Sequence, residues 1–250
     1  MPFVDMLLED VREMAEASRM LDLRLGAFFT IAVVETPDGR RAGLAATLGA
    51  GGHRHEENPP LPEAGRLLEQ APMAVAEYVH ADSTFQAAVG LATINALLTV
   101  DEDECTEINA ADLILEKGVG KRVAMVGHFP FVPAVREAAE ALDVLELEPR
   151  GSDRPAIEAS RVIPQADVVA ITGSTLLNHT FDALIALCEP DSYVVVLGGS
   201  TPLSSRFFSL GVDIVGGTRV GDIEGTLLAV SQGGGFRQIP GKRLLVMNRR

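Results

Sequence analysis

The chain is poor in cysteine and has no long apolar run. Only Cys105 and Cys188 occur among its 250 residues, far apart and with neither a CxxC spacing nor a neighbouring histidine. This excludes a thiolate zinc knuckle, a redox motif and a disulfide scaffold, so we expect both to be reduced core thiols. No apolar run approaches the roughly 18 residues of a membrane-spanning helix, and the first residues carry acids where a secretory signal carries bases. We therefore expect a cytoplasmic protein with no membrane partner.

Basic side chains are also scarce. Lys and Arg number 21 against 35 Asp and Glu, which gives a formal net charge of −14. Because nucleic-acid binding draws most of its affinity from cations on phosphates, we expect no nucleic-acid partner. Hydrophobic residues make up 47% of the chain, enough for a sizeable core. A chain of this length predicts one large domain or two small ones.

The first half begins with a helical pattern and continues with strand patterns. Apolar residues follow the helix period over residues 3–20 and alternate with a period of two over 23–33. A Pro-Asp-Gly turn at 37–39 then leads into a second strand pattern over 42–48. The sequence therefore predicts a helix followed by an antiparallel hairpin. The stretch 49–62, with three glycines and three prolines, predicts an exposed loop.

Two more helices are predicted before the middle of the chain. One covers residues 63–70, and a capping-box pattern beginning at Ser83 starts another over 85–98. The second has so few polar residues that it must be buried on more than one side. Gly90 in its middle lowers helix propensity, so we expect another backbone to come close there.

Beyond residue 121, apolar runs alternate with helix-length spacers. Near-continuous Val, Ile and Leu indicate strands covered on both faces, and hence a mostly parallel sheet with crossover helices. We therefore predict an α/β chain, with a small α+β domain over residues 1–105 and a Rossmann-like three-layer domain over 106–250. The predicted strands of the second domain are 122–126, 144–147, 167–171, 193–197, 212–215 and 243–247.

Glycine and hydroxyl residues follow three of these strands. Glycine lets a ligand approach the backbone, and Ser or Thr can cap the next helix and leave its amides facing an anion. Because ligands of such sheets bind beyond the carboxyl ends of the strands, we expect the three turns to line one polar, uncharged cleft. The alternative is that Gly-Ser/Thr simply makes the strand-to-helix turn. The turns are Thr172-Gly173-Ser174-Thr175, Gly198-Gly199-Ser200-Thr201 and Gly216-Gly217-Thr218.

The first strand of this domain ends in Gly127-His128-Phe129. It lacks the G-x-G-x-x-G spacing, which disfavours NAD-linked hydride transfer. Glu148 lies where an acid commonly meets ribose hydroxyls, with a solvated side chain beside Pro149 as the alternative. His128 is placed to act as general acid, general base or metal ligand, and Phe129 to stack on a planar ring. The alternative for His128 is a structural bond to a loop carbonyl.

A second histidine cluster lies in the 49–62 loop. His53 and His55 project to the same side of an extended segment, so they could chelate one divalent ion with Glu56 or Glu57. The alternative is a flexible loop with solvated charges. No nucleophile elbow, P-loop or HExxH pattern occurs, so hydrolase, kinase and zinc-protease functions have no specific support.

Four segments together resemble the family described as "Putative heavy-metal chelation", and the similarity covers nearly the whole chain. The segments are Gly90–Leu97, Val126–Pro130, Ile171–Asn178 and Gly198–Leu203. The resemblance implies an enolase N-terminal-like domain packed on a Rossmann-like domain, with a cleft between them. It also implies a role in making or handling a metal-chelating pterin-, flavin- or siderophore-like compound. At matching positions it implies cleft residues Asn95 in the first domain and His128, Phe129, Thr172, Gly173, Ser174, Asn178 and Ser200 in the second. No segment matches His53 to His55.

Our leading hypothesis is an enzyme that acts on a planar, polar small molecule, with His128 as the acid or base. The alternative is a non-catalytic protein that binds a metal or a metal chelate through His53, His55 or His128. A third hypothesis, an adenosylmethionine-type methyltransferase, fits the Rossmann-like half and Glu148. The cofactor stays open, with a divalent metal ion as one candidate, and the apolar first half favours a homodimer. The expected ligand-binding residues are Asn95, Gly127, Phe129, Glu148, Thr172, Gly173, Ser174, Thr175, Asn178, Gly198, Gly199 and Ser200.

Overall fold

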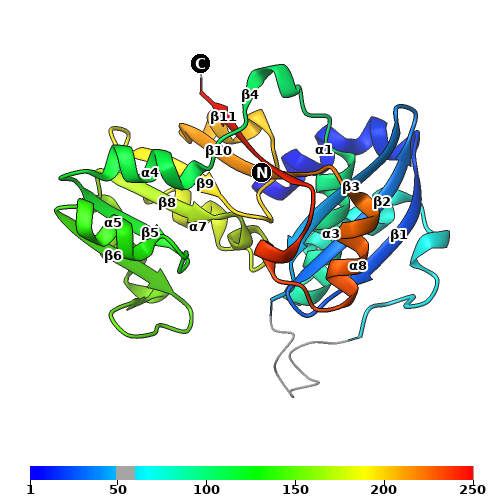
Figure 1. Ribbon diagram of the computed structural model, residues 1–250, viewed down its shortest axis with the longest axis horizontal. Coiled ribbons are helices and arrows are strands. Elements are labelled where there is room, and N and C mark those ends of the chain that lie inside the picture. The colour runs from blue at the N-terminus through cyan, green and yellow to red at the C-terminus, as the bar shows by residue number, and fades with distance from the viewer. Residues whose placement is uncertain (49–59, 250) are drawn as a thin grey trace.

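The computed structural model describes residues 1–48 and 60–249 and contains two β-sheets (Figure 1). The first has three antiparallel strands in the order β1-β2-β3. The second has eight strands in the order β4-β11-β10-β9-β8-β5-β6-β7 and is mostly parallel. The predicted α/β class is confirmed. Among the described residues, no helix has the length and apolar character needed to cross a membrane.

The amino-terminal part is a helix followed by the three-stranded sheet. Its helix, α1, covers Phe3–Glu16 and begins where predicted, but it ends four residues earlier, before β1 begins at Arg19. The single strand predicted over 23–33 is wrong, because the chain turns at Gly26, whose amide donates to the Phe29 carbonyl. Apolar alternation continues across this tight turn, so the period alone does not reveal it. The strands are β1 Arg19–Leu25, β2 Phe29–Thr36 and β3 Gly39–Ala46.

Two other predictions for this region fail. Residues 63–70 contain only the 3-10 turn η1, Leu67–Glu69, because Glu63 has a φ of 54°, which no α-helix contains. Helix α3 covers Thr84–Leu97, but the Ser83 side chain does not cap it. The Ser83 hydroxyl is instead buried and has no hydrogen-bond partner within residues 1–48 and 60–249. Helix α2, Pro72–Ala76, and the 3-10 turn η2, Glu77–His80, precede α3.

Helix α3 is buried by close backbone packing on both sides. A Cβ added to Gly90 would lie 2.0 Å from the Val79 amide nitrogen of η2, which confirms the expected close approach. On the opposite side, a Cβ at Gly43 of β3 would lie 2.2 Å from the Ala92 carbonyl oxygen of α3. Two glycines therefore let this helix fit between the sheet and the segment that contains α2 and η2.

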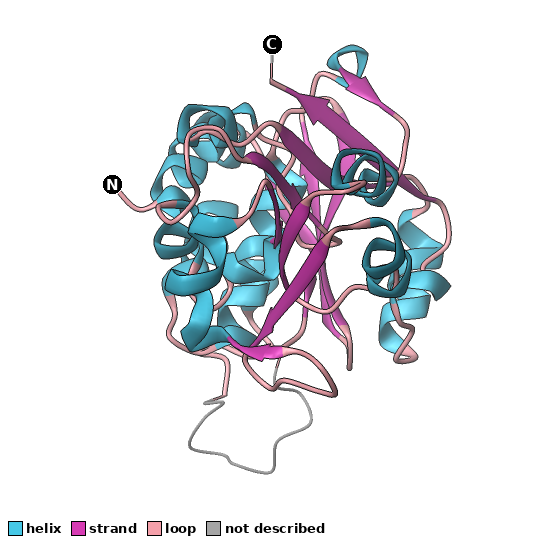
Figure 2. Cartoon of the chain, turned by 90° about the vertical axis from the view of Figure 1, so that its left-hand side faces the viewer, coloured by secondary structure: helices cyan, strands magenta, loops and turns pink. Residues whose placement is uncertain are grey.

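The carboxyl-terminal part places helices on both faces of the larger sheet, as Figure 2 shows. Its strands are β4 Cys105–Thr106, β5 Arg122–Val126, β6 Ala141–Glu146, β7 Arg154–Pro155, β8 Val168–Thr172, β9 Tyr193–Leu197, β10 Ile214–Val220 and β11 Lys242–Asn248. Its helices are α4 Ala110–Gly118, α5 Val132–Ala138, α6 Ala159–Val162, α7 Phe181–Ile185 and α8 Ile223–Ser231. The other 3-10 segments are η3 Glu102–Glu104, η4 Ala156–Glu158, η5 Ile163–Gln165, η6 Gly173–Leu176, η7 Ser205–Leu210 and η8 Phe236–Gln238.

One of the three predicted glycine turns does not end a strand. Gly216, Gly217 and Thr218 lie inside β10, which continues to Val220 and pairs antiparallel with β11. A Cβ at Gly216 would lie 2.5 Å from the Ala110 Cβ of α4. The prediction of a third strand-to-helix turn is therefore wrong, and this glycine serves the packing of α4 on the sheet.

The two halves of the chain share their cores. Helix α8 covers one face of the first sheet, where Leu227 and Val230 pack with Ile31 and Val33. Figure 1 shows this helix, in orange, beside the first sheet, where its neighbours are β1 and β2. The predicted division between residues 105 and 106 falls within β4, which pairs with β11.

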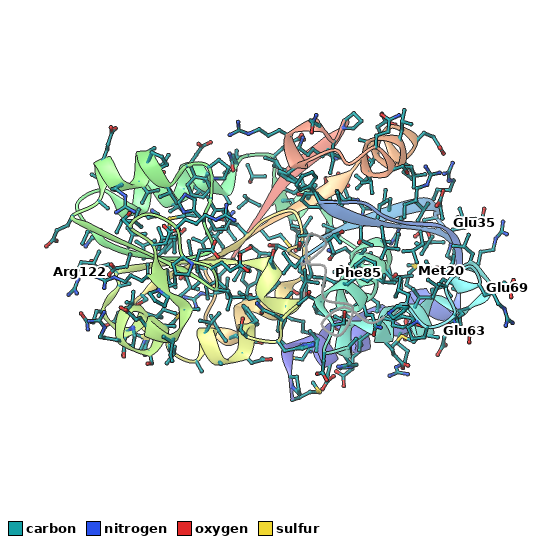
Figure 3. The ribbon with its side chains drawn as sticks, turned by 90° about the horizontal axis from the view of Figure 1, so that it is seen from below. Met20, Glu35, Glu63, Glu69, Phe85 and Arg122 are labelled. Carbon is teal, nitrogen blue, oxygen red and sulfur yellow. The ribbon has the colours of Figure 1, made fainter. Side chains whose placement is uncertain are left out.

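The core also joins the start of the chain to its carboxyl-terminal half. The Phe3 ring packs at a tilted angle against Phe181 and Phe207, with ring-centroid distances of 5.1 Å and 4.2 Å. Seen from below in Figure 3, Arg122 of β5 lies at one end of the molecule and Glu35 of β2 at the other.

Gly90→Ala should lower the free energy of unfolding by about 3 kcal/mol, because a methyl group at this position overlaps backbone atoms that cannot move aside. Gly235→Ala is the matched control, since its Cβ would lie no nearer than 3.7 Å to another group and its φ of −78° suits any residue. Urea denaturation measures both. Equal midpoints for the two variants contradict the packing described for α3.

Phe3→Ala should lower the free energy of unfolding by about 4 kcal/mol, because it leaves a cavity beside the two buried rings of Phe181 and Phe207. Phe28→Ala, at a side chain that is 57% exposed, should change it by no more than about 0.5 kcal/mol. Thermal unfolding followed by circular dichroism compares the two. If Phe3→Ala melts like the parent, α1 does not anchor the first half of the chain to the second.

Candidate functional site

Two cavities flank the carboxyl ends of β5 and β8. The first, of about 570 Å³, lies on the β6 side and is lined by His128, Glu146, Thr175 and Asn178 among others. The second, of about 610 Å³, lies on the β9 side. Phe129, Thr172 and Ser174 line both. The single cleft predicted from the sequence is therefore two adjoining cavities.

The cavities meet where the strand order reverses. The chain goes from β5 outward to β6 and then returns to β8 on the other side of β5. This is the switch point at which open α/β sheets bind ligands. Gly127, which follows β5, has a φ of 103°, and a Cβ there would lie 3.0 Å from Thr172 Cγ2. Only glycine fits both the conformation and the space.

His128 is held from two directions by carboxylates. Its Nδ1 lies 2.9 Å from Asp153 Oδ2, and its backbone amide donates to Glu146 Oε1 at 2.5 Å. The Asp153 side chain is 3% exposed, whereas that of His128 is 47% exposed. A buried carboxylate at Nδ1 fixes the ring and leaves Nε2 to exchange a proton or accept a ligand. The partner of the His128 ring is therefore a carboxylate. It is not a loop carbonyl, which was the alternative considered for a purely structural histidine.

The walls of the first cavity are largely apolar and its polar groups gather at the strand ends. Val126, Leu145, Leu184 and Leu187 are among the apolar lining residues. Cavities of this composition bind small molecules with an apolar body and a polar edge.

Several of the polar groups have partners within the protein. Thr172 Oγ1 accepts from the Ser174 amide, and the Thr175 hydroxyl donates to the Thr172 carbonyl. Asn178 Oδ1 accepts from the hydroxyl of Thr180 at 2.7 Å. The threonine hydroxyls therefore help to hold the turn after β8. The Ser174 hydroxyl, which accepts from Thr172 Oγ1 at 3.3 Å, and His128 also line the cavity.

Several other predicted ligand-binding residues do not line the first cavity. Gly198, Gly199 and Ser200 line the second cavity. Gly173 is buried and lines neither cavity. It packs directly against Thr201, since a Cβ at this position would lie 2.3 Å from Thr201 Oγ1. Glu148 is exposed in the connection after β6 and also lines neither.

Asn95 links three elements of the fold through hydrogen bonds and lines neither of the two cavities. Its Nδ2 donates to the Leu44 carbonyl of β3 at 2.8 Å and to the Ser200 carbonyl at 3.1 Å. Asn95 thus links α3, the first sheet and the turn after β9. His53 and His55 fall outside the described residues.

Sequence reasoning missed Asp153 and Glu146. Asp153 lies in the irregular β6–β7 connection, 25 residues from His128, and no local pattern pairs it with that ring. Glu146 ends β6, and the prediction placed this strand end at residue 147. The apolar pair Val144 and Leu145, followed directly by a carboxylate, was the signal available in the sequence.

The donor groups of the described residues do not fit a heavy-metal ion held by protein side chains alone. No three His, Cys, Asp or Glu side chains are grouped there for metal binding. Cys105 and Cys188 are separate free thiols, as expected. Burial raises the pKa of Cys188 to about 11 and also raises that of Cys105, so both are protonated at neutral pH. Soft metals bind the thiolate form.

Family models and known proteins match almost the whole chain. A model described as "Putative heavy-metal chelation" matches residues 109–248, and a second of the same description matches 8–98. An uncharacterized protein of Methanocaldococcus jannaschii is 24% identical over 241 residues, which span 89% of this chain and 90% of its own.

Two solved structures share the fold. A protein of unknown function from Pyrococcus horikoshii has a TM-score of 0.83 at 21% identity, over 98% of this chain and 99% of its own. Another from Desulfitobacterium hafniense has a TM-score of 0.77 at 20% identity, over 98% of this chain and 100% of its own. Both are named as members of the family whose model matches residues 109–248. The resemblance seen in the sequence is confirmed, and the chain belongs to the two-domain family described as "Putative heavy-metal chelation".

Proposed function

We propose that the first cavity binds a small organic molecule and that His128 exchanges a proton with it. The observation that carries this proposal is the bond of 2.9 Å between His128 Nδ1 and the buried Asp153 carboxylate, next to the switch point of the sheet. Pairs of this kind fix the tautomer and orientation of an imidazole that acts as acid or base.

The His128–Asp153 pair can transfer a proton to and from a bound molecule. With Nδ1–H donating to Asp153, the neutral ring carries its lone pair on Nε2 and can remove a proton from a bound molecule. The carboxylate then stabilises the imidazolium ion that forms, and the proton can be returned to a different atom of the same molecule. Such proton transfer accelerates reactions by about 10²- to 10⁴-fold.

The bound molecule is, in this proposal, itself the metal chelator. The family description points to heavy metals, while the described residues supply no group of three protein ligands. A pterin-, flavin- or siderophore-like compound brings its own oxygen and nitrogen donors, and its planar or apolar body suits the walls of the cavity. The alternative is a metal ion held by the protein, for which His53 and His55 are the remaining candidates.

A mixture of pterins, flavins, nucleotides and catechol carboxylates tests this proposal, with bound species identified by native mass spectrometry. The parent protein should retain one class of compound and, when incubated in heavy water, exchange a carbon-bound proton of that compound for deuterium, a change that raises the mass of the bound molecule with time. His128→Gln and Asp153→Asn should slow that change by about 100-fold, because the proton acceptor or its orienting carboxylate is lost. Ser174→Ala should weaken retention.

His80→Gln is the matched control, because His80 also faces a carboxylate, Asp5, at 3.3 Å but lies away from both cavities. It should behave like the parent. Retention and turnover that are unchanged in His128→Gln contradict the proposal. Stoichiometric uptake of zinc, nickel or copper ions without an organic molecule favours the alternative of a protein-held metal.

A further inference from the structure

The second cavity carries positive charge in a strongly acidic protein. Arg237 and Lys242 line it, and no Asp or Glu is among its lining residues within the described part of the chain. Neither Arg237 nor Lys242 has a carboxylate partner among the described residues. By contrast, Arg243, which follows Lys242, forms ion pairs with Glu102 and Glu107. In a chain of net charge −14, a cavity lined by two cations without carboxylates attracts an anion.

Aromatic rings lie at the same place. The Phe29 and Phe236 ring centroids are 5.6 Å apart, one ring coming from the first sheet and the other from the segment before β11. Gly199 lies against both, since a Cβ there would lie 2.8 Å from Phe236 and 2.9 Å from Phe29. Phe129 and Phe131 form a stacked pair that also lines the cavity. Aromatic walls of this kind bind planar rings.

The Lys242 ammonium joins the two features. Its Nζ lies 5.2 Å from the centroid of the Phe236 ring and donates to the Ile239 carbonyl at 2.9 Å. An ammonium group has three donors, so two remain for a ligand.

We propose that the second cavity binds an aromatic anion, a planar ring that carries a carboxylate or phosphate. The ring lies against Phe29 and Phe236, and the anionic group contacts Arg237 and Lys242. This site does not depend on the proposed function of His128, because these four side chains line only the second cavity.

Anthranilate, a fluorescent aromatic carboxylate, is the probe, and the absence of tryptophan removes the main protein fluorescence. The parent should bind it saturably. Arg237→Gln and Lys242→Gln should each raise its Kd by about tenfold, because each removes one charge-assisted contact. Anthranilamide, which has the same ring without the charge, and cyclohexanecarboxylate, which has the charge without the ring, should compete at least about tenfold less well. Phenyl phosphate as a competitor shows which anionic group the site prefers.

Arg12→Gln is the control for the loss of a surface cation, because Arg12 is exposed on α1 and lines neither cavity. It should leave the Kd of anthranilate unchanged, and so should His128→Gln. Thermal melting checks that Lys242→Gln folds, and Arg237→Gln, at an exposed side chain, tests the charge independently. The proposal is overturned if anthranilamide competes as well as anthranilate itself, if both cation variants bind like the parent, or if His128→Gln abolishes binding. It is equally overturned if no saturable binding occurs up to about 10 mM.

Discussion

The structure depends on close contact between helix α3 and the backbone on either side of it. Side chains at positions 43 and 90 would force β3 and η2 away from the helix, so glycine at both is what allows the contact. The helix contributes a continuous run of buried residues to a core that includes residues of both sheets. Because Asn95 on this helix also bonds to Ser200, the packing fixes the position of the first sheet relative to the turn after β9. The aromatic wall that Phe29 provides to the second cavity follows from this arrangement.

The two cavities use the same strand ends for different chemistry. On one side, a carboxylate-supported imidazole lies beside apolar walls, which suits proton exchange with a mostly uncharged molecule. On the other side, cations and phenylalanine rings lie together, and no Asp or Glu is among the described lining residues of that cavity, which suits an anion. Phe129, Thr172 and Ser174 line both cavities. Small molecules bound on the two sides would therefore be neighbours.

Much of the fold could be predicted from the sequence because it follows from the period of apolar residues. Strands β5 and β9 have the predicted bounds, and α1 differs only in its last residues. Two of the failures share a cause, because the turn at Gly26 and the continuation of β10 through two glycines depend on tertiary neighbours. The positive φ of Glu63 is a single-residue conformation that the period of apolar residues does not reveal. At the site, His128 was predictable from its place after a strand. Asp153 was not, because its pairing with that ring arises only when the β6–β7 connection folds back over β5.

The path of the chain after β10 has a consequence for synthesis. One face of the first sheet, made from residues 19–46, is covered by helix α8, which begins at Ile223. On the ribosome, the early strands emerge before that helix does, so the apolar side chains of Ile31, Val33 and Leu44 have no native cover until the residues from Ile223 onward have been made. A nascent chain of this protein therefore carries an uncovered apolar sheet face while residues 47–222 are synthesised, which is the kind of surface that holdase chaperones bind.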